Sequence, residues 1–132
     1  MAGCDTVLTQ EGYDDLASSN LSPAEFTFEV DWDYPLLEEM AATGVVCKWA
    51  NTGDVMVVVG QLAMDEQEWE STRAELEATR FVPDDSHGIP GFLNGRDGTT
   101  ESYLNRGFAW RNGILYYASY PGILEFVPAF QE

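Results

Sequence analysis

A two-residue turn signal, Asn112-Gly113, separates two runs of bulky residues and constrains the fold more than any other feature of the chain. Asn-Gly is the strongest short-range signal for a β-hairpin, because both central residues of a type I′ turn need a positive φ. A two-residue turn pairs the bulky side chains across the hairpin, Trp110 with Leu115 and Phe108 with Tyr117. These side chains then share one face, which we expect to meet the core.

The spacing of apolar residues predicts the other strands. Apolar and polar residues alternate over 26–30, which is typical of a half-buried strand. Residues 45–50 and 55–60 read as a second hairpin around a Gly-containing turn. The second arm of that hairpin is apolar on both faces, so we expect it to lie inside the sheet.

Three helices are predicted. The first runs to residue 18 after an N-cap at Thr9, with Leu8 and Tyr13 spaced as a hydrophobic staple. The second is short, begins after a cap at Asp33 and stops at Gly44. Its inner stripe is expected to comprise Leu36, Leu37, Met40 and Ala41. The third covers 64–80, carries acids at its start, and has a stripe so narrow that much of it should face solvent (Leu62, Trp69, Leu76).

These elements predict one α+β domain over residues 1–132. We expect a mainly antiparallel sheet of about five strands with helices packed on one face. A weak internal similarity suggests an α-β-β duplication. It links Cys47-Lys48-Trp49 with Phe108-Ala109-Trp110, each of which precedes a turn and an apolar arm.

The charge balance excludes some partners. The chain has 23 acidic against 6 basic residues, a formal net charge of −17. Binding to nucleic acid through phosphates needs Lys and Arg, which are scarce here, so we expect no nucleic-acid partner. An anionic membrane surface is disfavoured for the same reason. No apolar run approaches the length of a membrane-spanning helix.

Motifs for catalysis, metals and cofactors are weak. His87 is the only histidine, which excludes metal sites that need two histidines. The segment 91–95 lacks the Lys and Ser/Thr of a phosphate-binding loop. Paired carboxylates are too common to identify a hydrolase. Calcium near Asp31 and Asp33, or near Asn94, Asp97 and Asp85, stays open. We expect no cofactor.

The two cysteines, Cys4 and Cys47, leave two alternatives. In the first, they form one disulfide, whose loop closure would stabilise the folded state by about 4 kcal/mol in the chain-entropy model. In the second, they are two buried free thiols in a cytosolic protein. The start, Met1-Ala2-Gly3-Cys4, also looks like the end of a bacterial lipobox, in which Cys4 would carry a lipid.

The opening Cys4–Thr9 resembles poorly characterised cell-envelope lipoprotein and secreted domains of actinobacteria. In those domains a segment with a Trp leads to a short helix, a Gly-rich end and a Cys-x-Trp strand, and Trp32, Gly44 and Cys47-Lys48-Trp49 match here. The resemblance covers about the first 60 residues. It implies a Cys4–Cys47 disulfide and an extracytoplasmic location, but no activity. Because a signal sequence and linker are lacking, the chain could be excised from a longer, lipid-anchored protein.

The long connection 82–106 and the strand end at Trp32 form the predicted binding region. Loops on a rigid scaffold often carry binding groups, and Trp32 between Asp31 and Asp33 offers an apolar plane beside acceptors. Two aromatic residues, Phe92 and Tyr103, should hold the connection in place. We therefore expect a non-catalytic extracytoplasmic domain that binds a protein or glycan. The alternatives are a cytosolic acidic inhibitor or nucleic-acid mimic, and a carboxylate-dependent hydrolase.

Overall fold

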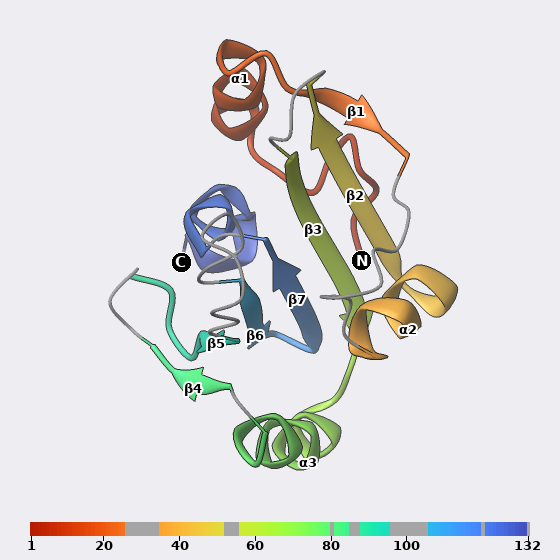
Figure 1. Ribbon diagram of the computed structural model, residues 1–132, viewed down its shortest axis with the longest axis vertical. Helices are drawn as coiled ribbons and strands as arrows, with labels where there is room; N and C mark the ends of the chain where they lie inside the picture. Colours follow the sequence, from red (N-terminus) through yellow and green to blue (C-terminus); the bar gives the residue numbers. More distant parts are fainter. Residues whose placement is uncertain are drawn as a thin grey trace.

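Seven strands form one antiparallel sheet in the described part of this computed structural model (Figure 1). The structure describes residues 1–25, 35–51, 56–79, 81–84, 88–95, 106–119 and 121–131. In chain order the elements are α1 (Gln10–Ser18), β1 (Ser22–Ala24), α2 (Pro35–Thr43), β2 (Val45–Ala50), β3 (Met56–Ala63), α3 (Glu66–Glu77), β4 (Val82–Pro83), β5 (Leu93–Asn94), β6 (Gly107–Arg111), β7 (Ile114–Ala118), and the 3₁₀ helices η2 (Pro121–Phe126) and η3 (Pro128–Phe130).

The strand order is β1-β2-β3-β7-β6-β5-β4, so the chain forms an α+β fold. The sheet is larger than the expected five strands because β1, β4 and β5 have only two or three residues each. Strands this short show no readable alternation. The two edge strands each contain a proline, Pro23 and Pro83, a residue that β-sheets tolerate mainly at their edges. The predicted strand over 26–30 lies outside the described residues.

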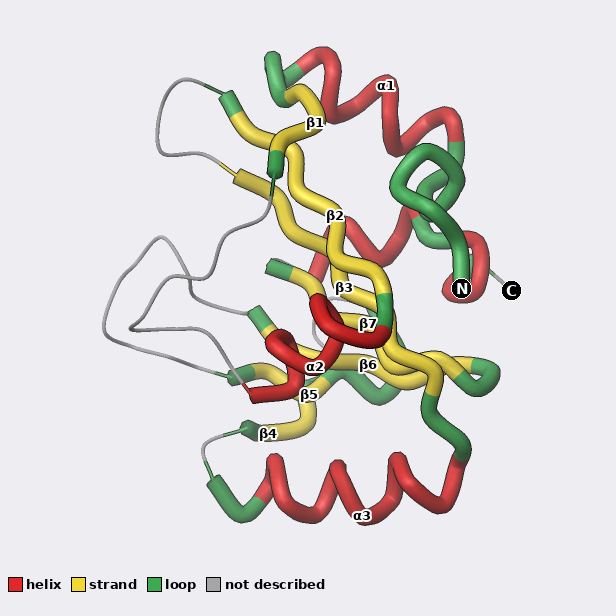
Figure 2. The backbone as a smooth tube through the Cα atoms, turned by 90° about the vertical axis from the view of Figure 1, so that its right-hand side faces the viewer, coloured by secondary structure: helices red, strands yellow, loops and turns green. Residues whose placement is uncertain are grey.

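Both faces of the sheet are buried, which corrects the expectation that helices cover one face. Val57, Val58 and Val59 are all nearly inaccessible to solvent, although successive residues of a strand point to opposite faces. On one face, the core includes Leu16 of α1 together with Ile123 of η2. The other face packs against α2 and α3 through Leu37, Met40 and Trp69. The helices α1 and α3 lie at opposite ends of the long axis (Figure 2).

The predicted hairpin around Asn112-Gly113 is confirmed. Both turn residues have positive φ, 51° and 86°, and the register pairs Phe108 with Tyr117 and Trp110 with Leu115. Those side chains belong to the core face shared with α2 and α3. The indole nitrogen of Trp110 also donates to the carbonyl oxygen of Met64 at 2.7 Å, which ties the hairpin to the chain leading into α3.

The hairpin of β2 and β3 is confirmed as well, with Ala50 opposite Met56. The second arm, β3, lies between β2 and β7, as its two apolar faces predict. Trp49 of β2 and Trp110 of β6 belong to the cores on opposite faces of the sheet. A duplication that superimposed these hairpins would keep equivalent side chains on equivalent faces. This difference argues against matching Cys47-Lys48-Trp49 residue by residue with Phe108-Ala109-Trp110, and the α-β-β duplication itself stays a prediction.

Local signals placed the helices well. Thr9 caps α1 by accepting a hydrogen bond from the Gly12 amide at 3.2 Å, and Asp65 caps α3 in the same way through Glu68. Trp69 is the buried residue of α3, whose other sides are mostly solvated, as the narrow stripe predicted. In α2, Leu37 and Met40 are buried but Ala41 is exposed, so its place in the inner stripe was wrong.

Gly44 ends α2 at a close approach to the sheet. A Cβ atom there would lie 2.0 Å from the carbonyl oxygen of Gln61 on β3. Only glycine lets the chain pass this close and turn directly into β2. No described helix is long and apolar enough to cross a membrane.

Candidate functional site

Most residues of the predicted binding region lie outside the described part of the chain. This holds for Trp32, Asp31, Asp33 and Tyr103, and for His87. Phe92 is described and fully buried in the core beside η2 and α1, where it anchors the long connection. A binding role for Trp32 stays a prediction.

The connection 82–106 contains structure that its length suggested. Its strands β4 and β5 pair with each other, and β5 also pairs with β6. The side-chain amide of Asn94 donates to the carboxylate of Asp84 at 3.0 Å. A pocket of about 290 Å³ lies beside them, lined by Pro83, Asp84, Gly91 and Phe92.

The disulfide between Cys4 and Cys47 is present, with Cα atoms 5.5 Å apart. It joins the N-terminal segment 1–8 to β2 across 43 positions of sequence. Because the sulfur of Cys4 is used in this bond, it cannot carry a lipid thioether at the same time.

Gln61 fixes the same segment from β3. Its side-chain oxygen accepts from the Ala2 amide at 3.1 Å, and its side-chain nitrogen donates to the Ala2 carbonyl at 2.7 Å. The side-chain amide of Gln61 therefore bonds to both the N–H and the carbonyl of Ala2, as the backbone of a neighbouring strand would. This satisfies a polar side chain that is only 1 % exposed.

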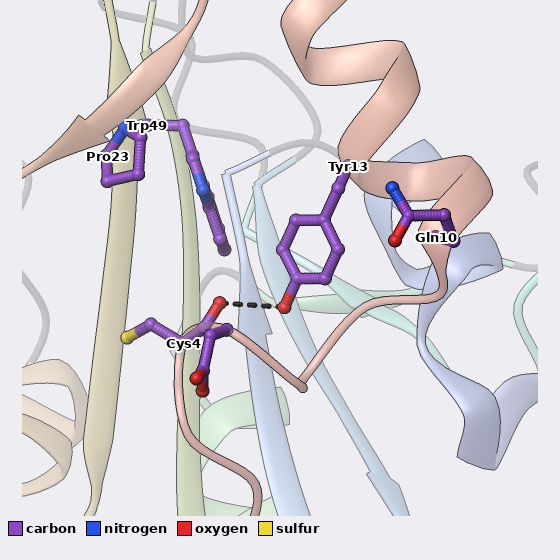
Figure 3. Close-up of a pocket in the computed structure, with 6 residues that line it drawn as sticks. Cys4, Gln10, Tyr13, Pro23 and Trp49 are labelled. Carbon is purple, nitrogen blue, oxygen red and sulfur yellow. Dashed lines mark hydrogen bonds between the residues drawn. The ribbon is translucent and has the colours of Figure 1, made fainter.

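A larger pocket opens where this N-terminal segment meets α1 and β2. It has a volume of about 430 Å³ and is lined by Cys4, Asp5, Gln10, Tyr13, Pro23 and Trp49. Figure 3 shows Tyr13 and Gln10 on the side of α1, Pro23 and Trp49 on the side of the sheet, and Cys4 between them. This volume is within the range of small-molecule sites. The volume of the pocket at Phe92 is at the lower limit of that range.

Two aromatic rings form the apolar part of this α1–β2 pocket. The centroids of Tyr13 and Trp49 are 6.2 Å apart with their planes tilted by 58°. Trp49 is 3 % exposed and held by the core, whereas Tyr13 is half-buried. Pro23 on β1 is paired with Trp49 on the neighbouring strand β2, so the two side chains share one face of the sheet.

The polar groups of the pocket have defined orientations. The hydroxyl of Tyr13 donates to the Cys4 carbonyl at 2.7 Å and accepts from the Leu8 amide at 3.2 Å. The side-chain nitrogen of Gln10 donates to a carboxylate oxygen of Asp14 at 2.9 Å. A carboxylate can only accept, so this bond leaves the side-chain oxygen of Gln10 directed away from Asp14. Asp5 adds an exposed carboxylate.

The groups around the pocket can contact a ligand through aromatic surface and hydrogen bonds. Around the pocket, the described side chains offer a disulfide sulfur, a tyrosine hydroxyl already in two hydrogen bonds, and the carboxylate of Asp5. A nucleophile beside a general base, the usual arrangement for covalent catalysis, does not occur among them. Within the described ranges no group of three His, Cys, Asp or Glu side chains could hold a metal ion.

The sequence contained signals for this site that were interpreted separately. Cys47 and Trp49 are two positions apart on one strand and therefore share a face. Tyr13 was assigned to a hydrophobic staple beside Leu8, whereas its hydroxyl forms the contact that closes the pocket. The pairing of Pro23 with Trp49 was not predicted, because the three-residue strand Ser22–Ala24 is too short to show an alternation.

No protein-family model matches the chain, and the searches found no significantly similar curated protein or solved structure.

Proposed function

We propose that this protein is a non-catalytic extracytoplasmic binding domain that holds its ligand in the α1–β2 pocket. The observation that carries this proposal is a cavity of about 430 Å³ with two aromatic walls, Tyr13 and Trp49. The disulfide and the Gln61–Ala2 hydrogen bonds fix the segment on its third side. A preformed, braced pocket lowers the entropic cost of binding.

The compartment is inferred from the cysteines. Disulfides persist in oxidising compartments and are rare in the cytosol, so the Cys4–Cys47 bond supports an extracytoplasmic location. Membership of an actinobacterial envelope or secreted class, with a lipid anchor elsewhere in a longer chain, belongs to the same proposal. Alkylation of free thiols in protein isolated from the natural host tests the extracytoplasmic location. We expect no alkylation without reductant, and two alkylated cysteines would favour the cytosolic acidic interaction protein.

Ligand binding can be tested with a mixed set of oligosaccharides and short peptides, followed by NMR of the tryptophan indole signals. We expect binders to shift the signal of Trp49, while Trp69, on the opposite face of the sheet, stays unchanged. Two variants form a matched pair, because each adds an exposed phenylalanine to the first turn of α1. Gln10→Phe should fill the pocket and abolish the shifts, whereas Glu11→Phe should preserve them.

The proposal fails if binders shift signals elsewhere and leave Trp49 unchanged, or if both phenylalanine variants behave alike.

A further inference from the structure

The ligand class follows from the polar groups of the α1–β2 pocket, so this inference rests on the proposed function. The hydrogen bonds that each polar side chain at the pocket already forms determine what it can still offer to a ligand. Tyr13 has its hydroxyl proton engaged by the Cys4 carbonyl. The side-chain nitrogen of Gln10 is directed to Asp14, which leaves the Gln10 oxygen as the available acceptor.

Asp5 completes this set with a carboxylate that can only accept. The described rim of the pocket therefore offers more acceptors, the Gln10 oxygen and the two Asp5 carboxylate oxygens, than donors, the second N–H of the Gln10 amide, beside apolar walls. A ligand that matches it must supply several N–H donors and must tolerate an aromatic surface. A ligand rich in acceptors, or an anion, would leave these groups unpaired.

Charge points in the same direction. No Lys or Arg precedes Lys48 in the sequence, while α1 carries three exposed acids, Glu11, Asp14 and Asp15. Lys48 itself does not line the pocket, because it alternates with Cys47 and Trp49 and so faces the other side of the sheet. The net charge of −17 adds a long-range attraction for cations.

We propose that the α1–β2 pocket binds the guanidinium group of an arginine side chain on a basic polypeptide partner. A guanidinium is planar and stacks on aromatic rings, and its five N–H donors can serve two separate acceptors at once. The ammonium of lysine has a compact, strongly hydrated charge and matches this combination less well. The aliphatic stem of arginine packs against Pro23 and Trp49, while its head reaches Asp5 and Gln10.

The test uses N-acetyl-arginine amide as the probe and N-acetyl-citrulline amide as its neutral, nearly isosteric control. Titrations at low ionic strength are followed by the NMR signals of Trp49 and Tyr13. We expect the arginine compound to shift both signals and the citrulline compound to bind about tenfold more weakly, since a charged hydrogen bond is lost. Added salt should weaken the binding of the arginine compound and leave the binding of the citrulline compound unchanged.

Two carboxylate variants distinguish the site from general attraction to an acidic protein. Asp5→Asn removes a charge from the pocket and should weaken binding about two- to fivefold. Glu75→Gln removes the same charge from an exposed position on α3 and should leave binding unchanged. The two variants keep the fold if their denaturation midpoints match that of the parent protein.

Equal binding of arginine and citrulline compounds, or equal effects of the two variants, would overturn the proposal. If a neutral oligosaccharide shifts Trp49 and the arginine compound does not, the guanidinium inference fails while the proposed function stands. If no compound of either class shifts Trp49, both fail.

Discussion

The hydroxyl of Tyr13 donates a hydrogen bond of 2.7 Å to the main-chain carbonyl of Cys4. Through its sulfur the same Cys4 is bonded to Cys47 on β2, so one residue connects α1 with the sheet. The α1–β2 pocket lies between these two connections, and its shape depends on both.

Replacing Tyr13 with phenylalanine tests the first connection. The ring would stay, but the Cys4 carbonyl would lose its donor and the Leu8 amide its acceptor. We expect a loss of about 1–2 kcal/mol in the free energy of unfolding, the usual effect of deleting such a group. Chemical denaturation measures it, and an unchanged midpoint would contradict the hydrogen bonds.

Removing the disulfide should have a larger effect. The double variant Cys4→Ala/Cys47→Ala should lose about 4 kcal/mol, because the unfolded chain regains the freedom of a long loop. Reduction of the parent protein should lower its denaturation midpoint, whereas the same reductant should leave the double variant unaffected. Intact mass after alkylation without reductant should show no modified cysteine.

The turn at Gly113 provides a test of backbone conformation alone. Gly113 has a φ of 86°, and a Cβ there would have no atom within 4 Å apart from those of Gly113 and its two neighbours in the chain, so a substitution meets no tertiary steric clash. Gly113→Val should cost about 1–2 kcal/mol, because β-branched residues resist positive φ. Gly113→Asn should cost less, since asparagine tolerates this region. Equal costs for the two variants would argue against a backbone origin.

Alkaline pH should destabilise the protein through Tyr116. Burial raises the pKa of Tyr116 above its ordinary value of 10.0, because the phenolate is poorly solvated beside Phe130. The folded state therefore binds this proton more tightly than the unfolded state. This contribution to stability is fully present below pH 10 and is lost as the pH rises above it toward the raised pKa.

Absorbance titration of the phenolate with denaturation at each pH measures this effect. Tyr116→Phe should remove one tyrosine transition above pH 10 and flatten the loss of stability above that pH. If the variant keeps the same slope of stability against pH, another group is responsible.

Several parts of the fold could be predicted from the sequence because neighbouring residues determine them. The turn at Asn112-Gly113 selects its own conformation, and its register follows from the two-residue loop. The N-cap at Thr9 bonds to an amide three positions further along. The second hairpin followed from two strand-length runs on either side of a Gly-containing turn. The residues alone left the Cys4–Cys47 bond as one of two alternatives, the resemblance to other domains implied it, and the structure confirms it.

Tertiary structure alone decided the short strands, the two-sided core and the pocket. Strands β1, β4 and β5 are too short to produce a pattern. The longer strands β2 and β6 offer unpaired edges to β1 and β5, and β4 then pairs with β5. The hydrogen bonds from Gln61 to Ala2 join residues 59 positions apart, and no local pattern records which distant backbone group a buried amide will meet. Pro23, Trp49 and Tyr13 likewise come together only after the sheet has paired and α1 has packed on it. Local preferences are set by neighbours in the chain, whereas a cavity is set by how separately formed elements fit against one another.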